Sequence, residues 1–276
     1  MPVSAPATPS SAKWGARSVR RSYDRSGYLE DGERAAFASV GDAALDGARI
    51  LDLAVGGGRT TTFLAPVAGT YLGVDISPEM LRMALGRHPG VAFAQGDLAD
   101  LSGFADAGWD VIDVSFNSID VLDHDQRRRS LRDLHRMLVP GGHLVISSLL
   151  LHPGPVDAPS FGELAPALTR RGWRHPRMRA AQTRDTLLGL WHFRRNRSQI
   201  VEGDGWAWRP LRGHEFRFVT YFSTLPHAIA GFREAGLDVV GAWSPTGLPL
   251  RLERRASPRG VGHAHFHCRR PAEDAA

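Results

Sequence analysis

The chain has 276 residues, of which 42% are hydrophobic and 23% are charged, enough for one sizeable core and marginal for two independent domains. No run approaches the roughly 18 apolar residues of a membrane-spanning helix, and the N-terminus lacks the apolar segment of a secretory signal. We therefore expect a cytoplasmic protein without a membrane partner. Cys268 is the only cysteine, which excludes intramolecular disulfides and multi-cysteine zinc sites.

The formal net charge is +5, and two explanations of it stay open. A basic protein is suited to an anionic partner such as nucleic acid or a phosphorylated metabolite. However, Lys13 is the only lysine, so nearly all positive charge is arginine, and with the many Ala and Gly residues this is typical of a GC-rich genome. We favour the compositional explanation and expect no nucleic-acid partner.

The pattern along the chain predicts a single α/β domain with an inserted region. Residues 1–16 lack periodicity, which predicts a disordered tail, and 17–46 are expected to form a helical cap. From 47 to 151 short apolar runs alternate with helical segments, the signature of a mostly parallel sheet. The expected strands are 48–54, 69–76, 91–97, 109–116 and 142–149, and the expected helices between them are 60–64, 78–85 and 125–138.

Residues 152–213 break this rhythm. They contain four of the seven tryptophans together with paired arginines, and we interpret them as an insert or lid. Residues 214–276 are expected to form the C-terminal part of the same sheet, with strands at 214–223, 237–244 and 262–268 and a helix at 225–236.

Glycines follow the first expected strand in the segment ILDLAVGGGRTT. Glycine lets the backbone pass close to a ligand, and the helix that follows offers unpaired N–H groups. A nicotinamide dinucleotide fold has a related loop, but Thr61 stands where the third glycine of its fingerprint is required. This motif by itself therefore indicates a ligand loop without naming the ligand.

Acidic residues end the next two expected strands. Asp75 in YLGVDISPEML is placed to accept both hydroxyls of a ribose, because a carboxylate offers two acceptor oxygens. Asp97 and Leu98 in AQGDLADL suit the amino group and the face of an adenine ring. WDVIDVSFNSIDVL and the helix, Pro-Gly-Gly turn and strand of LRDLHRMLVPGGHLVIS complete five motifs in order.

This ordered set resembles the class I S-adenosylmethionine-dependent methyltransferases, strongly over residues 48–150 and weakly over 214–270. The resemblance implies a Rossmann-like, doubly wound, mostly parallel seven-stranded sheet with an antiparallel last strand. It also implies S-adenosylmethionine as cofactor, S-adenosylhomocysteine as product, and no metal. The cofactor-binding residues it implies are Tyr28, Asp52, Ala54, Gly56, Gly58, Asp75, Ile76, Met80, Asp97, Leu98, Ser115 and Phe116.

Ala54 replaces the first glycine usual in the family, which narrows the space beside the methionine part of the cofactor. Two other assignments have alternatives. Asp52 either contacts cofactor or only satisfies N–H groups of the loop. Tyr28 either covers the cofactor or packs on the sheet edge.

Catalytic residues are harder to assign, since methyl transfer is an in-line displacement in which alignment and exclusion of water do much of the work. If the acceptor is a hydroxyl, His152 is the first candidate for its base, because a histidine titrates near neutral pH. Tyr221 and Asn117 are candidates for orienting the acceptor. For each of the three, an ordinary structural role is the alternative.

The insert is expected to shape the acceptor pocket. Trp191 offers a stacking face, His192 a proton acceptor, and Arg195 an anchor for a carboxylate or phosphate. We therefore expect a small-molecule acceptor, aromatic or carboxylate-bearing, in specialised metabolism.

Three histidines alternate in the C-terminal segment GHAHFHC, on one face of an expected strand. His263 and His267 would lie about 13 Å apart at roughly 3.3 Å per residue, too far for all three imidazoles to hold one ion. We therefore interpret His263, His265 and His267 as half-exposed residues of the sheet and predict no metal site.

Two other functions stay open. The basic charge is compatible with an RNA or protein methyltransferase, although the fourth motif reads SFNS and not the Asn-Pro-Pro-aromatic set of many enzymes that methylate base nitrogens. The cofactor motifs are also compatible with a non-catalytic S-adenosylmethionine-binding partner or sensor, because they report binding only. The oligomeric state is not predicted.

Overall fold

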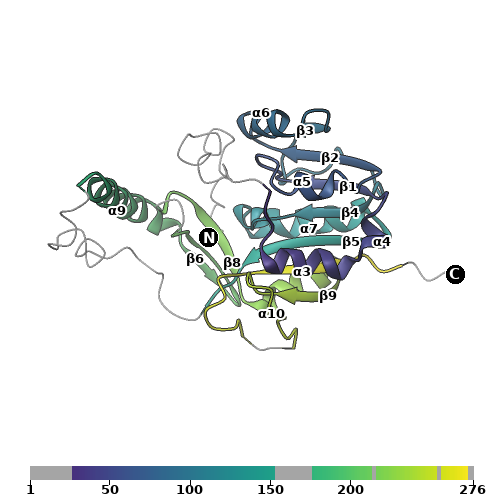
Figure 1. Cartoon of the computed structure of the whole chain (residues 1–276). Coiled ribbons are helices and arrows are strands. Elements are labelled where there is room, and N and C mark those ends of the chain that lie inside the picture. Colours follow the sequence, from purple (N-terminus) through teal and green to yellow (C-terminus); the bar gives the residue numbers. More distant parts are fainter. Residues whose placement is uncertain (1–26, 153–175, 213–215, 254–255, 273–276) are drawn as a thin grey trace.

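A seven-stranded sheet forms the centre of the protein in the computed structural model, which describes residues 27–152, 176–212, 216–253 and 256–272 (Figure 1). The expected tail at 1–16 lies outside the described residues. The strand order is β3-β2-β1-β4-β5-β10-β9. The strands are β1 (Arg49–Leu53), β2 (Thr70–Asp75), β3 (Phe93–Gln95), β4 (Trp109–Val114), β5 (Leu138–Leu149), β9 (Asp238–Trp243) and β10 (His263–Arg269).

The five strands from β3 to β5 pair in parallel, and β10 pairs antiparallel with both β5 and β9. The predicted fold class, with its antiparallel last strand, is therefore confirmed. Because parallel strands end at the same edge, the chain emerging from β1, β2, β4 and β5 converges there, as open α/β sheets require for a ligand site.

Helices cover both faces of this sheet. Because successive side chains of a strand point to opposite faces, each strand contributes apolar side chains to the core on both sides. Ile50 and Val111 pack with α3 on one face, while Leu51 and Ile112 join the core beneath α7 and α10 on the other. The helices of the two layers are α3 (Asp31–Val40), α4 (Asp42–Leu45), α5 (Thr61–Leu64), α6 (Pro78–Arg87), α7 (His124–Met137) and α10 (Leu225–Glu234), and a 3-10 turn, η1 (Ser118–Val121), precedes α7.

The ends of these helices follow local sequence chemistry. The Ser77 side chain caps α6 by accepting a hydrogen bond from the Met80 N–H, and Pro78 occupies the first turn, as expected. Asp123 and Gln126 form a capping box that starts α7 one residue before the expected position. None of the helices in the described ranges is long and apolar enough to cross a membrane.

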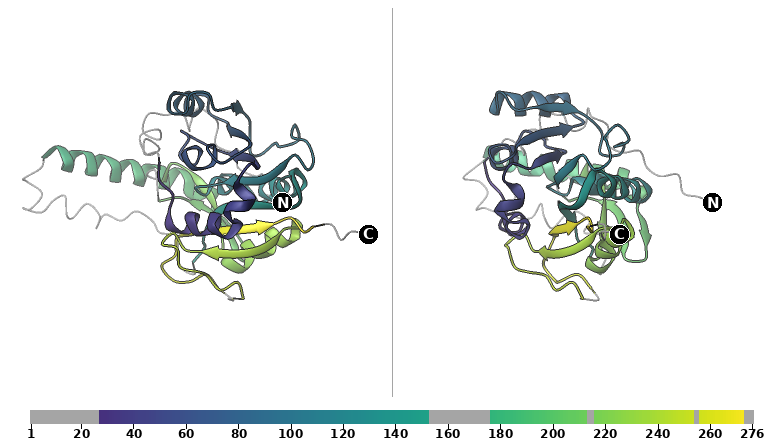
Figure 2. Two further views of the ribbon diagram at one scale, coloured as in Figure 1. Left: turned by 45° about the vertical axis from the view of Figure 1, so that its right-hand side comes forward. Right: turned by 90° about the vertical axis from the view of Figure 1, so that its right-hand side faces the viewer.

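A second, three-stranded antiparallel sheet contains β6 (Val201–Gly203), β7 (Trp206–Pro210) and β8 (Val219–Ser223). The expectation that the strand near 214–223 continues the main sheet is wrong, because β8 pairs over its whole length with β7. The long helix α9 (Pro176–Asn196) and a 3-10 turn, η4 (Arg197–Gln199), precede this sheet. Figures 1 and 2 show α9 extending away from the main sheet.

Candidate functional site

A cavity of about 1180 Å³, partly open to solvent, lies at the carboxyl edge of the main sheet. It receives residues from the ends of β1, β2, β3, β4 and β5, from β8 and from the chain that precedes β8. Its lining is Leu53, Ala54, Gly56, Val74, Asp75, Ile76, Met80, Gly96, Asp97, Leu98, Phe116, Asn117, Ser118, Val121, Leu122, Leu149, Leu211, Phe218 and Thr220.

The loop after β1 borders this cavity with an unusual backbone. Gly56 and Gly58 have φ angles of 56° and 80°, in the left-handed region that glycine adopts without strain. Ala54 has a φ of 55° although it carries a Cβ, so the replacement of the family's glycine costs backbone strain as well as space. Gly58 lies outside the cavity lining, and a Cβ there would meet the His88 ring at 2.6 Å. Its role is close packing against the end of α6.

Asp75 is buried at the end of β2, with one carboxylate oxygen 2.9 Å from the Gly56 amide nitrogen and the other 2.8 Å from that of Ser77. Burial raises the pKa of the Asp75 carboxyl, and these two N–H donors oppose the rise. Each carboxylate oxygen has a second lone pair, so the group can still accept hydrogen bonds from hydroxyls in the cavity. Asp75 therefore fixes the β1 loop and faces the ligand space at once.

The adjoining residues Ile76, Met80, Asp97 and Leu98 line the same cavity. Asp97 accepts a hydrogen bond from the Ala99 amide at 2.9 Å, which orients its carboxylate. Apolar side chains flanking a carboxylate are the surroundings that an aromatic base with an exocyclic amino group requires.

Phe116 and Asn117 follow β4 with φ angles of 57° and 59°, so two successive non-glycine residues adopt the left-handed conformation. Such strain persists only where the surroundings enforce it, and it is typical of ligand sites. The backbone N–H of Asn117 donates a hydrogen bond to the Ser147 hydroxyl, with a nitrogen–oxygen distance of 2.7 Å. The buried Asn117 side-chain oxygen has no hydrogen-bond partner in the described part of the chain, so it is an acceptor available to a ligand.

A smaller cavity of about 480 Å³ lies next to the first and is lined by Tyr28, Asp52, Ala54, Val55, Gly56, Gly57, Arg59, Thr60, Ser115, Phe116 and Ser118. The two cavities share Ala54, Gly56, Phe116 and Ser118. Tyr28, Asp52 and Ser115 therefore border the smaller cavity, while the ribose and adenine candidates border the larger one.

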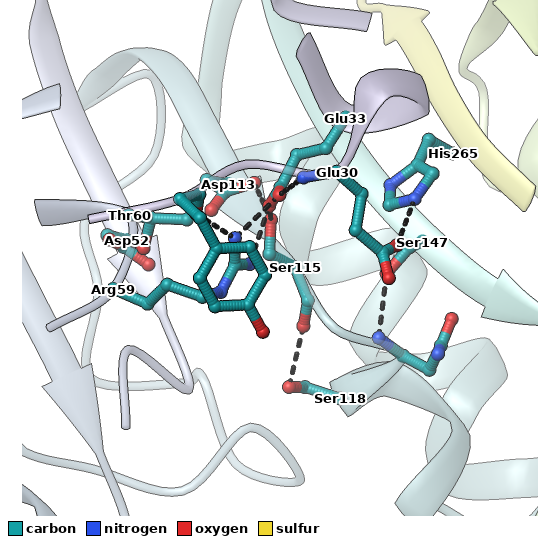
Figure 3. Close-up of polar contacts among 12 residues, drawn as sticks. Glu30, Glu33, Asp52, Arg59, Thr60, Asp113, Ser115, Ser118, Ser147 and His265 are labelled. Carbon is teal, nitrogen blue, oxygen red and sulfur yellow. Dashed lines mark hydrogen bonds and ion pairs between the residues drawn. The ribbon is translucent and has the colours of Figure 1, made fainter. Parts of the chain in front are cut away.

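A buried ion pair joins α3 to the loop after β1 beside the smaller cavity (Figure 3). Arg59 donates to both Glu33 carboxylate oxygens, at 2.6 and 2.7 Å, and to the Tyr28 carbonyl oxygen. The guanidinium carbon lies 5.2 Å from the centre of the Tyr28 ring and 5.1 Å from that of Phe116. The sequence analysis missed both Glu33 and Arg59, because nothing in the local pattern of α3 shows which distant loop its acidic residue meets.

Two further carboxylates lie close to this ion pair. Asp52 accepts hydrogen bonds from the Thr60 and Tyr71 hydroxyls at 2.6 and 2.7 Å, and burial raises its pKa to about 6. Burial, followed by the charges of Asp52 and Glu33, raises the pKa of Asp113 well above its usual range. Three carboxyl groups thus face one guanidinium, and a cation in the smaller cavity would favour their ionised forms.

The three catalytic or orienting candidates lie in different places. Asn117 lines the larger cavity, as described above. The His152 ring nitrogen Nε2 is 2.7 Å from the Val261 carbonyl oxygen, and His152 is not among the cavity-lining residues. Thr220 of β8 lines the cavity, whereas its neighbour Tyr221 is directed to the opposite side of the strand, as alternation requires.

Tyr221 instead lies between two histidines that the sequence analysis did not single out. Its hydroxyl is 3.0 Å from His124 Nδ1 and 3.1 Å from His227 Nε2, and burial raises its pKa. Trp206 of β7 stacks on the His124 ring with centres 4.5 Å apart. This aromatic cluster joins the second sheet to α7 and α10, so the Tyr221 position gives no support to acceptor orientation.

The insert candidates Trp191, His192 and Arg195 lie together on α9, near its C-terminal end. The Trp191 side chain contacts both others, with ring centres 4.9 Å apart for His192 and the Arg195 guanidinium 5.4 Å from the Trp191 ring centre. Trp191 is 54% exposed, and none of the three lines the larger cavity. Among the described residues of the insert, Leu211 reaches the cavity.

The C-terminal histidines differ from the half-exposed residues that were expected, because His265 and His267 are each only 2% exposed. His267 contacts the Ser39 hydroxyl and the His143 ring, at 2.8 and 2.9 Å. His263 and His265 both contact Glu30, 2.7 and 2.9 Å from its oxygen Oε2. His267 therefore has other partners than His263 and His265, in line with the expectation that the three imidazoles are too far apart to hold one ion.

Comparison with known proteins adds a family. Residues 50–142 match the model of a methyltransferase domain. The chain is 32% identical over 109 residues to a demethylmenaquinone methyltransferase of Chlorobaculum parvum, covering 39% of this chain and 44% of that protein. A demethylmenaquinone methyltransferase of Renibacterium salmoninarum is 28% identical over 178 residues, which is 62% of this chain and 72% of that protein. The chain thus spans less than half the length of the first of these relatives.

Among solved structures, S-adenosylmethionine-bound CalS10 from Micromonospora echinaspora, an amino pentose methyltransferase, has a TM-score of 0.50. The identity is 19%, with 92% of this chain and 95% of that chain covered, so this likeness concerns the fold alone. Together, the strand order, the ligand loops and the match over 50–142 lead to one conclusion: the chain contains a methyltransferase domain, and its sheet has the Rossmann-like fold of the class I S-adenosylmethionine-dependent methyltransferases.

Proposed function

We propose that the protein is an enzyme that transfers a methyl group from S-adenosylmethionine to a small, largely apolar acceptor. One observation carries this proposal: residues from five separate strand ends, including Asp75, Asp97 and Asn117, line a single cavity. Five separate segments of chain meet there, and the family match covers four of the five strand ends. A packed structural core has no need of such convergence of polar groups on empty space.

The donors and acceptors present fit this cofactor. Asp75 offers lone pairs for ribose hydroxyls, and Asp97 with Leu98 offers an acceptor and an apolar face for adenine. The excess of carboxyl groups around Asp52 suits the positively charged methionine part, which we place in the smaller cavity that Tyr28 borders. The bound cofactor supplies an electrophilic methyl group on a sulfonium.

The acceptor is proposed to occupy the end of the cavity formed by Leu149, Leu211, Phe218 and Thr220. Three of these four side chains are apolar, and the lining drawn from the described residues includes no arginine or lysine. This favours an apolar acceptor over the carboxylate-bearing one expected from the arginines of the insert. The two named acceptor types of similar proteins, demethylmenaquinone and an amino pentose, differ from each other, so they leave the acceptor of this chain open.

The chain contributes mainly by positioning and by excluding water. The Asn117 side-chain oxygen and the Ser118 and Thr220 hydroxyls can orient a polar group on the acceptor. Leu211 and Phe218 close the cavity with apolar surface, which keeps water from competing with the acceptor. Among the described residues, the titratable side chains in the lining are Asp75 and Asp97.

A turnover experiment tests the proposal. Purified protein is incubated with S-adenosylmethionine and a panel of small apolar hydroxyl, amine and quinol compounds, and S-adenosylhomocysteine formation is followed by mass spectrometry. We expect at least one acceptor to give product, and we expect turnover to decrease in Asp75→Ala. The exposed acid variant Asp46→Ala is the control and should retain activity.

The same samples separate the competing functions. Cofactor binding without turnover on any acceptor would indicate a non-catalytic binding protein. RNA binding that weakens steeply with salt, together with methylation of RNA, would instead indicate a nucleic-acid methyltransferase. A role in specialised metabolism stays a prediction until an acceptor is found.

A further inference from the structure

Glu30, His263 and His265 bring three potential metal-ligand atoms together outside the cavity lining. The atoms are one carboxylate oxygen and two imidazole Nε2 nitrogens, all within 4.8 Å of one another. Both nitrogens point at the same oxygen, at 2.7 and 2.9 Å. The two rings meet edge to face with their centres 5.1 Å apart.

We propose that Glu30, His263 and His265 form a binding site for a borderline divalent cation, of which Zn²⁺ is the probe. Two imidazoles and one carboxylate are the protein ligands of many three-coordinate zinc sites that keep a fourth position open. In a tetrahedral site with bonds of about 2.0–2.1 Å, ligand atoms lie roughly 3.3 Å apart. The two nitrogen–oxygen distances, 2.7 and 2.9 Å, need to increase by only about half an ångström to reach this spacing, and the two nitrogens lie within 4.8 Å of each other.

The surroundings hold these ligands in place before any ion binds. His263 and His265 lie two residues apart on β10, so strand alternation directs both to the α3 face. Glu30 precedes α3, and its amide nitrogen is 3.2 Å from a Glu33 carboxylate oxygen. Gly32 fits so closely that an added Cβ would lie 2.0 Å from the Ser244 carbonyl oxygen and 2.7 Å from the His265 ring. The start of α3 is therefore fixed against the two histidines.

The charge and exposure of the cluster also suit a cation. Glu30 supplies a carboxylate to the site, and the Nε2 nitrogens of His263 and His265 both lie within hydrogen-bond distance of its oxygen Oε2. The side chains of Glu30 and His263 are 26% and 20% exposed, whereas that of His265 is 2% exposed. Solvent thus reaches one side of the cluster, where an ion would keep a water molecule.

The cluster lies close to the larger cavity. His263 and His265 stand directly opposite Leu149 and Ser147 of β5. Leu149 lines the larger cavity, and Ser147 accepts the hydrogen bond from the Asn117 amide. The proposed ion therefore lies one strand away from the acceptor end of the cavity, without replacing any cofactor-binding residue.

Calorimetric titration of the untagged, metal-free protein with Zn²⁺ alone tests the proposal. We expect one ion per chain, and binding that is weakened roughly 100-fold or more in Glu30→Gln and in His263→Gln. The matched control is His143→Gln, which removes a half-buried imidazole from the same face of the sheet. Binding should be unchanged in this variant.

Localisation of the ion does not depend on a variant that folds. Anomalous diffraction at the zinc edge from wild-type crystals should place density between the three ligand atoms. Density elsewhere, no stoichiometric binding, or equal weakening in His143→Gln would overturn the proposal and leave the cluster as a structural link between α3 and β10. S-adenosylmethionine affinity, measured with and without chelator, should be unaffected, so this result and the failure of methyl transfer are distinguishable.

Discussion

The two ends of the larger cavity are built in different ways. At the end that we propose binds the cofactor, here called the cofactor end, Ala54, Asp75 and Asp97 lie at or just after the ends of successive strands, within a stretch of about forty residues of β-α units. At the end that we propose binds the acceptor, here called the acceptor end, Leu149 lines the cavity together with Leu211, Phe218 and Thr220, which come from the second sheet and the chain next to it. The cofactor end is thus fixed by repeated local geometry, while the acceptor end depends on how two sheets pack. Variation in the second sheet can change the acceptor without disturbing the first.

The largest expected effect is on the stability of the cofactor end. Arg59→Met leaves Glu33 buried without its partner, and breaking a buried ion pair from one side typically costs about 3–5 kcal/mol of unfolding free energy. Urea denaturation measures this change. Arg82→Met is the matched control: it removes an exposed pair with Glu79 and should cost at most about 1 kcal/mol. Equal losses in both variants would contradict the structural role of the Arg59 pair.

Asp75→Ala separates the two ends by binding. We expect S-adenosylmethionine affinity to decrease by about 1.5–3 kcal/mol, because a charged hydrogen-bond acceptor is removed from the cavity. Calorimetry measures the dissociation constant, and circular dichroism checks that the variant is folded. If the folded variant binds as tightly as the wild type, the ribose acceptor has been assigned to the wrong residue.

Leu211→Ala tests the acceptor end in the same way. Truncating this side chain removes apolar contacts from the proposed acceptor space. We expect kcat/KM for the acceptor to decrease, with a loss of transition-state stabilisation of about 1–3 kcal/mol, while cofactor affinity stays within a few-fold of the wild-type value. Leu187→Ala on α9 is the matched control, since that leucine is 51% exposed. If turnover decreases in the control but not in Leu211→Ala, the acceptor binds instead near the α9 residues Trp191, His192 and Arg195.

The titration of Asp52 predicts a pH dependence confined to the cofactor end. Its pKa is raised to about 6, so the carboxyl is largely protonated at pH 5 and ionised at pH 7. A cationic ligand binds the ionised form more strongly, so S-adenosylmethionine affinity should increase several-fold as the pH rises through about 6. Asp52→Asn should flatten this profile. A wild-type affinity that is constant over this interval would show that Asp52 stays uncoupled from the bound cofactor.

The smallest effect concerns the strained loop. Ala54→Gly removes the backbone strain of a left-handed alanine, but it also increases the conformational entropy of the unfolded chain. Because the first effect is the larger one, the substitution should stabilise the folded protein by about 0.5–1 kcal/mol. Ala107→Gly is a matched variant, because Ala107 has a φ of 49° and lies outside the cavity lining. Both should raise the unfolding temperature, but only Ala54→Gly should alter cofactor affinity.

The sequence by itself determined the cofactor end of this protein. Asp75, Asp97 and Asn117 each follow an apolar strand, and parallel strands bring such residues to one edge whatever the rest of the chain does. The fold class followed from the same alternation of strands and helices. The sequence also shows alanine at position 54 where the family usually has glycine, but the backbone strain at Ala54 is seen only in the structure.

Only the tertiary structure decided which distant segments meet. Glu33 pairs with Arg59, and Glu30 meets His263 and His265 more than two hundred residues later, because α3 packs across β5, β9 and β10. No periodicity along the chain encodes such contacts. The register of β8 against β7 likewise turned Thr220 toward the cavity and Tyr221 away from it, since a strand directs successive side chains to opposite faces.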